Sequence, residues 1–216
     1  MYVSDIMTTN VVTIPSNTSI ADAKRIMEAH RVRRLPVVDK GKLVGIVTDR
    51  RLEGVSPSKA TSLTVWELSY LLDKTPVRKI MERDVVTVSP DMTVEESVAL
   101  AQSHKVGAAV VVEEGKVVGI VTNNDFFYRI VNPVLGLGLP GTRIGVVGGG
   151  ETKALAGIIS TINELGLEIT TLHIEQLPEA KKKDVCVHVG TEDAEDVSKL
   201  LAELKDKGYR VSLRKR

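Results

Sequence analysis

Hydrophobic and polar positions follow one pattern twice along the first 131 residues. In each occurrence a short apolar run, VVTI (11–14) or VVTV (85–88), leads through a polar stretch to apolar residues at helical spacing. Two more apolar runs follow each helix, joined by a turn that contains Gly41 or Gly115, and a second helix then begins at the Thr of GIVT. The pattern predicts the element order β-α-β-β-α for each occurrence.

The two occurrences are copies of one unit. A shift of 74 positions aligns residues 5–49 with residues 79–123 without a gap, and 16 of the 45 aligned residues are identical. Such internal similarity is typical of a structural unit that is present twice. We therefore predict two small domains, at residues 1–54 and 77–131.

Capping boxes mark the expected helix starts. Ser19-x-x-Asp22 precedes the first helix of copy one, and Thr93-x-x-Glu96 precedes that of copy two. In a capping box the side chain of the first residue accepts a hydrogen bond from a free N–H group of the first helical turn. Each helix should therefore begin directly after Ser19 or Thr93.

A further capping box, Thr64-x-x-Glu67, predicts a connecting helix within residues 55–76. Trp66 and Tyr70 share one of its faces and are expected in the core or at an interface. Its apolar side is predicted to consist of Val65, Leu68, Leu71 and Leu72.

Residues 142–216 follow a different pattern. Four strand-like runs and two amphipathic helices, each stopped by Gly166 or Gly208, occur in the order β-α-β-β-α-β. This is the ferredoxin-like order, in which one sheet carries two helices on one face. Residues 132–141 are rich in Pro and Gly and are expected to form a hinge without a helix or a central strand. The predicted fold class is α+β.

Composition argues against several functions. The 29 Lys and Arg residues nearly balance 28 Asp and Glu residues, so no overall charge indicates binding to nucleic acid or to a membrane surface. No apolar stretch approaches the roughly 18 residues that a membrane span requires. Cys186 is the single cysteine, which excludes an internal disulfide and fits a reducing compartment. We therefore expect a cytoplasmic protein.

Other chemical signals are weaker. The glycines within residues 145–153 match neither phosphate-loop pattern, so nucleotide hydrolysis is not expected. His173, Cys186 and His188 lie on adjacent predicted strands and could ligate zinc, but packing roles are more common for such residues, and we predict no metal site. No Ser or Cys is combined with a base and an orienting acid in a recognisable order. We therefore predict that the protein is not an enzyme.

The duplicated unit resembles the CBS domain family in its IM…VVT opening, in HRVRRLPVVD (30–39) and in GIVTNND (119–125). The resemblance implies a pseudo-symmetric pair with two clefts, which in the family commonly hold AMP, ATP or S-adenosylmethionine. Residues 142–216 look like an ACT domain, which implies dimerisation or amino-acid binding. The combination is similar to regulatory proteins of acetoin utilisation of the AcuB type. It implies a homodimeric regulator with an adenine nucleotide as its regulatory ligand and no other cofactor.

The sequence Thr122-x-x-Asp125 is the expected centre of ligand binding. An ionised Asp accepts two hydrogen bonds, which suits the 2′ and 3′ hydroxyls of a ribose. Thr122 stands where the strand enters the helix, so its hydroxyl and the free N–H groups of the first turn can face a phosphate. The same sequence is also a capping box, in which Asp125 would serve only its own helix.

The first copy departs from this pattern. It keeps Thr48 but has Arg51 where the second copy has Asp125, and a guanidinium cannot accept hydrogen bonds from ribose hydroxyls. We expect the site around Thr48 to be weak, empty or anion-binding.

Basic residues gather before the LPVV strand of the first copy. Arg33 and Arg34 stand where the second copy has Gly107 and Ala108, and in the family this place faces the clefts. Guanidinium groups suit phosphate oxygens. We therefore expect Arg33 or Arg34 to lie across the cleft from Asp125, with Ala108 also at the site. The alternative is that Arg33 is a solvated charge near a helix end.

A second function stays open. If the clefts are vestigial, the chain is a ligand-free assembly module that docks on an enzyme or a transporter.

Overall fold

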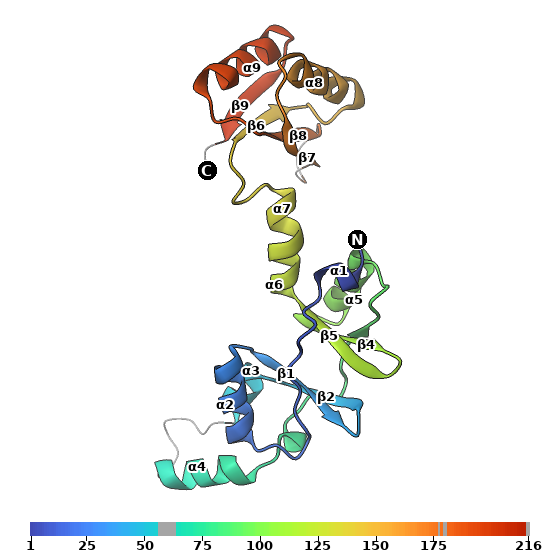
Figure 1. Cartoon of the computed structure of the whole chain (residues 1–216), viewed down its shortest axis with the longest axis vertical. Coiled ribbons are helices and arrows are strands. Elements are labelled where there is room, and N and C mark those ends of the chain that lie inside the picture. The colour runs from blue at the N-terminus through green and yellow to red at the C-terminus, as the bar shows by residue number, and fades with distance from the viewer. Residues whose placement is uncertain (56–63, 177, 179–180, 215–216) are drawn as a thin grey trace. The chain divides into compact units, whose positions relative to one another are not determined.

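The structure is a computed structural model that describes residues 1–55, 64–176, 178 and 181–214. The chain divides into two compact units, Met1–Phe126 and Phe127–Arg216 (Figure 1). Helices and strands occur in both units, so the predicted mixed α+β class is confirmed. The finer domain boundaries given above stay predictions.

The first unit contains the two copies. Each has a helix, an antiparallel hairpin and a second helix in the predicted order. The first copy comprises α2 (Ile20–His30), β1 (Arg34–Asp39), β2 (Lys42–Thr48) and α3 (Asp49–Gly54). The second comprises β3 (Thr87–Val88), α5 (Val94–Ser103), β4 (Ala108–Glu113), β5 (Lys116–Thr122) and α6 (Asn123–Phe126).

The opening strand differs between the copies. In the second copy the N–H of Val110 donates to the carbonyl of Val86 at 3.0 Å, and β3 runs parallel to β4. The first copy has Pro36 at the position equivalent to Val110, and proline has no N–H to donate. Only Ile14 forms a parallel bridge there, so the strand predicted at residues 11–14 is wrong except at its last residue.

The predicted helix starts are confirmed, because Ser19, Thr64 and Thr93 each accept a hydrogen bond from the N–H three residues later. The connecting helix is α4 (Val65–Lys74). Residues 56–63 of the predicted connector, and the side chains of Val65 and Leu68, lie outside what the structure describes.

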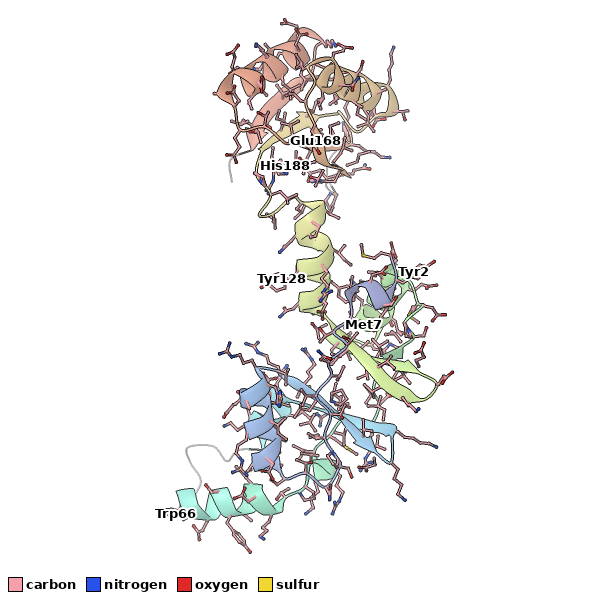
Figure 2. The ribbon with its side chains drawn as sticks, in the orientation of Figure 1. Tyr2, Met7, Trp66, Tyr128, Glu168 and His188 are labelled. Carbon is pink, nitrogen blue, oxygen red and sulfur yellow. The ribbon has the colours of Figure 1, made fainter. Side chains whose placement is uncertain are left out.

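Two aromatic residues of α4 project outward. Trp66 is 86% exposed and Tyr70 is 63% exposed, and Figure 2 shows Trp66 at the outer end of this helix. The prediction that these two residues lie in the core is therefore wrong. The side of α4 that carries Leu72 packs against the hydrophobic core of the first copy instead.

The two copies exchange the segments that precede them. Thr8, which precedes copy one, pairs with Ile120 of copy two through two backbone hydrogen bonds of 2.9 and 3.0 Å. Glu82, which precedes copy two, pairs with Ile46 of copy one through two bonds of 2.9 Å. The short helices in these segments are α1 (Val3–Ile6) and η1 (Val77–Lys79). Each segment therefore completes the other copy.

Two glycines permit this exchange. A Cβ atom on Gly119 would lie 2.5 Å from Sδ of Met7, and one on Gly45 would lie 2.7 Å from Sδ of Met81. Met7, labelled in Figure 2, and Met81 occupy equivalent positions of the repeat. Met81 belongs to the hydrophobic core of the first copy, so the segment that precedes copy two also packs into that core.

The second unit has the predicted ferredoxin-like topology. Its antiparallel sheet has the order β7-β8-β6-β9, and apolar residues of the sheet pack with those of both helices in one core. The elements are β6 (Thr142–Val147), α8 (Thr152–Glu164), β7 (Ile169–Glu175), β8 (Asp184–Val189), α9 (Ala194–Asp206) and β9 (Arg210–Arg214).

Helical structure extends into the predicted hinge. A π-helical turn, η2 (Phe127–Val131), is followed directly by α7 (Asn132–Val134). The prediction that residues 132–141 hold no helix is therefore wrong at their start. Pro133 is tolerated because it stands at the beginning of a short helix, where a missing N–H costs little, and because the preceding π turn loosens the i−4 spacing.

Candidate functional site

A cleft of about 790 Å³ lies between the two copies in the first unit. It is bordered by the ends of β1 and β2, by α3, by residues 82 and 84–86, and by residues 104–108 of the second copy. Its charged lining residues are Arg34, Arg50, Arg51, Glu82, Asp84 and Lys105, and its apolar ones include Ile46, Val85, Val86 and Val106. We call it the first cleft, because it contains Thr48.

The first cleft gathers three of the residues that the sequence predicts at the ligand site. Arg34 and Thr48 are direct cross-strand neighbours on β1 and β2, and Ala108 approaches from the start of β4. Arg33 does not line this cleft, since its side chain is 83% exposed and lies 3.8 Å from the carboxylate of Asp49. The pairing of Arg34 with Thr48 follows from their facing positions in the hairpin.

Thr122 and Asp125 lie in the other half of the pair. Oδ2 of Asp125 accepts hydrogen bonds from the N–H and the hydroxyl of Thr122, both at 2.7 Å. Among the residues that the structure describes, Oδ1 has a single long contact, of 3.5 Å, with the hydroxyl of Thr8. The capping interaction is thus present, and one carboxylate oxygen of the half-buried Asp125 keeps capacity to accept further hydrogen bonds.

Arg51, at the position equivalent to Asp125, makes the opposite kind of contact. Its Nη2 forms an ion pair with Oε2 of Glu82, and its Nη1 lies 3.5 Å from the carbonyl of Ile80. Thr48 accepts a hydrogen bond of 3.3 Å from the N–H of Arg51 and so caps α3. The guanidinium therefore connects α3 of the first copy to the segment that precedes the second copy, and Arg51 and Glu82 both line the first cleft.

Glu82 and Thr8 were not recognised in the sequence as site residues. The 74-residue shift aligns them with each other, and it also aligns Arg51 with Asp125. The two copies therefore share an equivalent contact with different chemistry. It joins Arg51 to Glu82 in one half and Asp125 to Thr8 in the other. The alignment contained this signal, but only the exchange of the leading segments brings the members of each pair together.

The second unit offers less at its glycine-rich loop. The N–H of Gly148 donates to Oδ1 of Asp184 at 2.8 Å, and that of Gly150 donates to the carbonyl of Lys183 at 2.9 Å. These two groups are therefore already used within the unit. In the part of the chain that the structure describes, no cluster of three or more His, Cys, Asp or Glu residues could hold a metal ion.

The sequence model of the CBS domain matches residues 3–55 and 77–132, so the chain belongs to the CBS domain family and carries a tandem pair of these domains. It is 31% identical over 123 residues to the CBS domain-containing protein YhcV of Bacillus subtilis, a match that covers 57% of this chain and 81% of YhcV. CBS pairs are generally regulatory modules and also occur inside enzymes. An inosine-5'-monophosphate dehydrogenase of Korarchaeum cryptofilum is 34% identical over 125 residues, but these span only 23% of that enzyme.

Two solved structures resemble the pair. One is a Vibrio cholerae protein assigned to acetoin utilization (AcuB), with 35% identity, a TM-score of 0.52, and coverage of 63% of this chain and 94% of that one. The other is the CBS domain pair of protein MJ0100 in complex with 5'-methylthioadenosine and S-adenosyl-L-methionine, with 29% identity, a TM-score of 0.50, and coverage of 61% and 97%. No helix among the described residues has the length and apolar character needed to cross a membrane.

Proposed function

We propose that this chain is a regulatory protein whose second half binds an adenosine compound of the AMP, ATP or S-adenosylmethionine class at Thr122 and Asp125. The observation that carries the proposal is the arrangement of Asp125. Its Oδ2 accepts two hydrogen bonds from Thr122. Among the described residues, the hydrogen-bond donor nearest to its Oδ1 is the hydroxyl of Thr8, at 3.5 Å. A similar CBS pair, that of MJ0100, was crystallised with two adenosine compounds.

The held carboxylate suits a ribose. Fixing one oxygen with two hydrogen bonds orients the other, so little side-chain entropy is lost when sugar hydroxyls donate to it. The 74-residue shift aligns residues 30–34 with residues 104–108, which line the first cleft. By the same symmetry we expect Arg33 beside the site at Asp125, where its guanidinium would suit the phosphate end of the ligand. The ligand would contact both copies and favour one arrangement of the pair.

Replacing Asp125 tests this proposal. Asp125→Asn keeps an oxygen that can accept from Thr122 but loses the charge, so we expect adenosine and AMP to bind at least about tenfold more weakly, at about 1.4 kcal/mol per tenfold. Asp125→Ala should abolish binding and also cost about 1 kcal/mol of stability through the lost cap. Isothermal titration calorimetry and thermal unfolding measure the two effects separately.

The outcome against the proposal is equally definite. Wild-type protein that gives neither heat nor a thermal shift with adenosine, AMP, ATP or S-adenosylmethionine, and that is a tight homodimer, would favour the alternative of a ligand-free assembly module. Equal binding by wild type and Asp125→Ala would remove Asp125 from the site.

For the second unit we propose an ACT-like role in homodimerisation. Its edge strands β7 and β9 carry apolar residues that are about half exposed, Ile174 at 46% and Leu213 at 50%, and exposed edges of this kind favour association with another sheet. Amino-acid binding at the glycine-rich loop is the less favoured alternative, because Gly148 and Gly150 already donate their N–H groups within the unit.

A further inference from the structure

Three buried nitrogen atoms of the second unit have no hydrogen-bond partner among the residues that the structure describes. They are Nε of Arg143, Nδ1 of His173 and Nδ1 of His188. The core that the sheet shares with α8 and α9 contains the alternate residues of the strands, so these three side chains lie on the opposite, helix-free face. Buried polar atoms without partners are unfavourable, so whatever covers this face is held at a cost.

Residues 132–141, which we call the linker, cover His188 on this face. Gly136 is buried, and a Cβ atom at its position would clash with Nδ1 of His188. A Cβ atom on Gly141 would lie 3.0 Å from Nε2 of the same ring. Nη2 of Arg143 donates to the carbonyl of Gly136 at 2.7 Å and so attaches the linker to β6. His188, labelled in Figure 2, is therefore 2% exposed although α8 and α9 pack on the other face.

The described residues around His188 offer its ring no carboxylate as a partner. Its direct cross-strand neighbours are Arg143 on β6, which is permanently cationic, and Thr171 on β7. The carboxylates of Asp184 and Glu192 already accept hydrogen bonds from backbone N–H groups, at 2.8 and 3.2 Å. The other titratable or charged residues described on this face are His173, Glu175, Cys186 and Arg210.

A proton added to His188 would oppose the closed position of the linker. Both ring nitrogens would then be donors, and the new positive charge would be buried beside the guanidinium of Arg143. When the linker moves away, water can hydrate both groups. Because protonation favours the open arrangement, acidification shifts the equilibrium toward it.

We propose that the contact between the linker and the helix-free face is a pH-sensitive switch, closed while His188 is neutral and open when it is protonated. An imidazole in water takes up its proton near about pH 6.5, so the closed contact is stable above this pH and weakens as the pH falls through it. The linker joins the CBS pair to this sheet, and its release lengthens the free chain between them. The switch does not depend on ligand binding at Asp125.

Amide hydrogen exchange of the full-length protein tests the switch. Rates are expressed as protection factors, which removes the intrinsic dependence of exchange on pH. Between about pH 7.5 and about pH 5.5, protection of Gly136, Leu137 and Gly141 should fall by about tenfold, the limit for release coupled to one proton over this range. The amides of Val185 and Val187 in β8 should stay protected, because the sheet itself is not expected to open.

Substitutions at His188 separate its proton from other effects of acid. His188→Gln keeps a polar side chain that takes up no proton, so linker protection should be the same at both pH values. His188→Lys carries a charge at both, so linker protection should be low at both while β8 stays protected. The matched control is His30→Gln, because His30 is exposed at the end of α2 in the first unit and its loss should leave the response unchanged.

His173→Gln distinguishes the two histidines of this face. It should respond to pH like the wild type, because the linker glycines lie against the ring of His188. Equal protection of the linker at both pH values in the wild type would overturn the proposal. So would a pH response that persists in His188→Gln, or one that is lost in His173→Gln alone. Wild type and His188→Gln decide the matter even if His188→Lys does not fold.

Discussion

The two halves of the CBS pair place different side chains at one contact. In the second half the carboxylate of Asp125 lies beside the hydroxyl of Thr8, and in the first half the guanidinium of Arg51 pairs with the carboxylate of Glu82. The backbone around both contacts is equivalent, since Thr8 and Glu82 each form a two-bond bridge with the facing strand. The scaffold therefore fixes where the contact lies, and the side chains decide its chemistry.

The difference concerns both members of the contact. Asp125 is an acceptor with spare capacity next to a weak donor, whereas Arg51 is a donor next to an acceptor that already satisfies it. A change at one member alone would leave two carboxylates together or a guanidinium without its partner. Substitutions at both members of the contact, at the glycines next to the crossing segments and in the opening strand test this difference between the halves.

The largest expected effect comes from the double variant Arg51→Asp with Glu82→Thr, which gives the first half the residues of the second. Two charge-assisted hydrogen bonds to ribose, at about 1.5 kcal/mol each, should raise adenosine affinity in the first cleft by about 100-fold. Calorimetry should show the stoichiometry rise from one adenosine to two per chain.

The single variant Arg51→Asp is the control for this exchange. It leaves two carboxylates facing each other, so it should gain much less affinity than the double variant. A stoichiometry that stays the same in the double variant would show that something other than this contact sets the difference between the halves.

The glycines under the crossing segments should respond unequally. A Cβ atom on Gly45 would lie 2.8 Å from the carbonyl oxygen of Glu82, which is backbone, whereas on Gly119 the carbonyl of Thr8 is 3.3 Å away and the closest atom belongs to the flexible Met7 side chain. We expect Gly45→Ala to lower the free energy of unfolding by about 2–3 kcal/mol and Gly119→Ala by about 1 kcal/mol. Urea unfolding of both variants measures this, and equal losses would contradict it.

The smallest effect concerns the opening strand. Val110→Pro removes the N–H that bonds to the carbonyl of Val86, so it should make the second copy resemble the first at a cost of about 1–2 kcal/mol. Pro36→Val should change stability by less than about 1 kcal/mol. Amide hydrogen exchange around Val88 should be faster in the first variant, and unchanged exchange there would show that Pro36 is not the cause of the difference between the copies.

Much of the fold was predictable because its signals are local. Capping residues such as Ser19 and Thr93 lie three residues from the N–H groups that they accept from, and the hairpins form between neighbouring runs. The ferredoxin-like order of the second unit was readable for the same reason. The errors arose where backbone chemistry is decided by a partner, as at Pro36, or by the turn before it, as at Pro133.

The candidate site was only partly predictable. The sequence identified Asp125 and the unusual Arg51, because the repeat aligns them and a carboxylate and a guanidinium differ in what they can accept. It did not identify Glu82 or Thr8, whose significance depends on where the chain crosses.

From the sequence alone it follows that one unit occurs twice, that only the second copy has an acidic residue three positions after the Thr of GIVT, and that a ferredoxin-like unit follows. Tertiary structure alone decided that each leading segment completes the other copy, which brings together residues 31 and 117 positions apart. It also decided that Arg34 shares a cleft with Thr48. The sequence specifies the chemistry of each side chain directly. A contact between distant segments forms only after packing has positioned those segments next to each other.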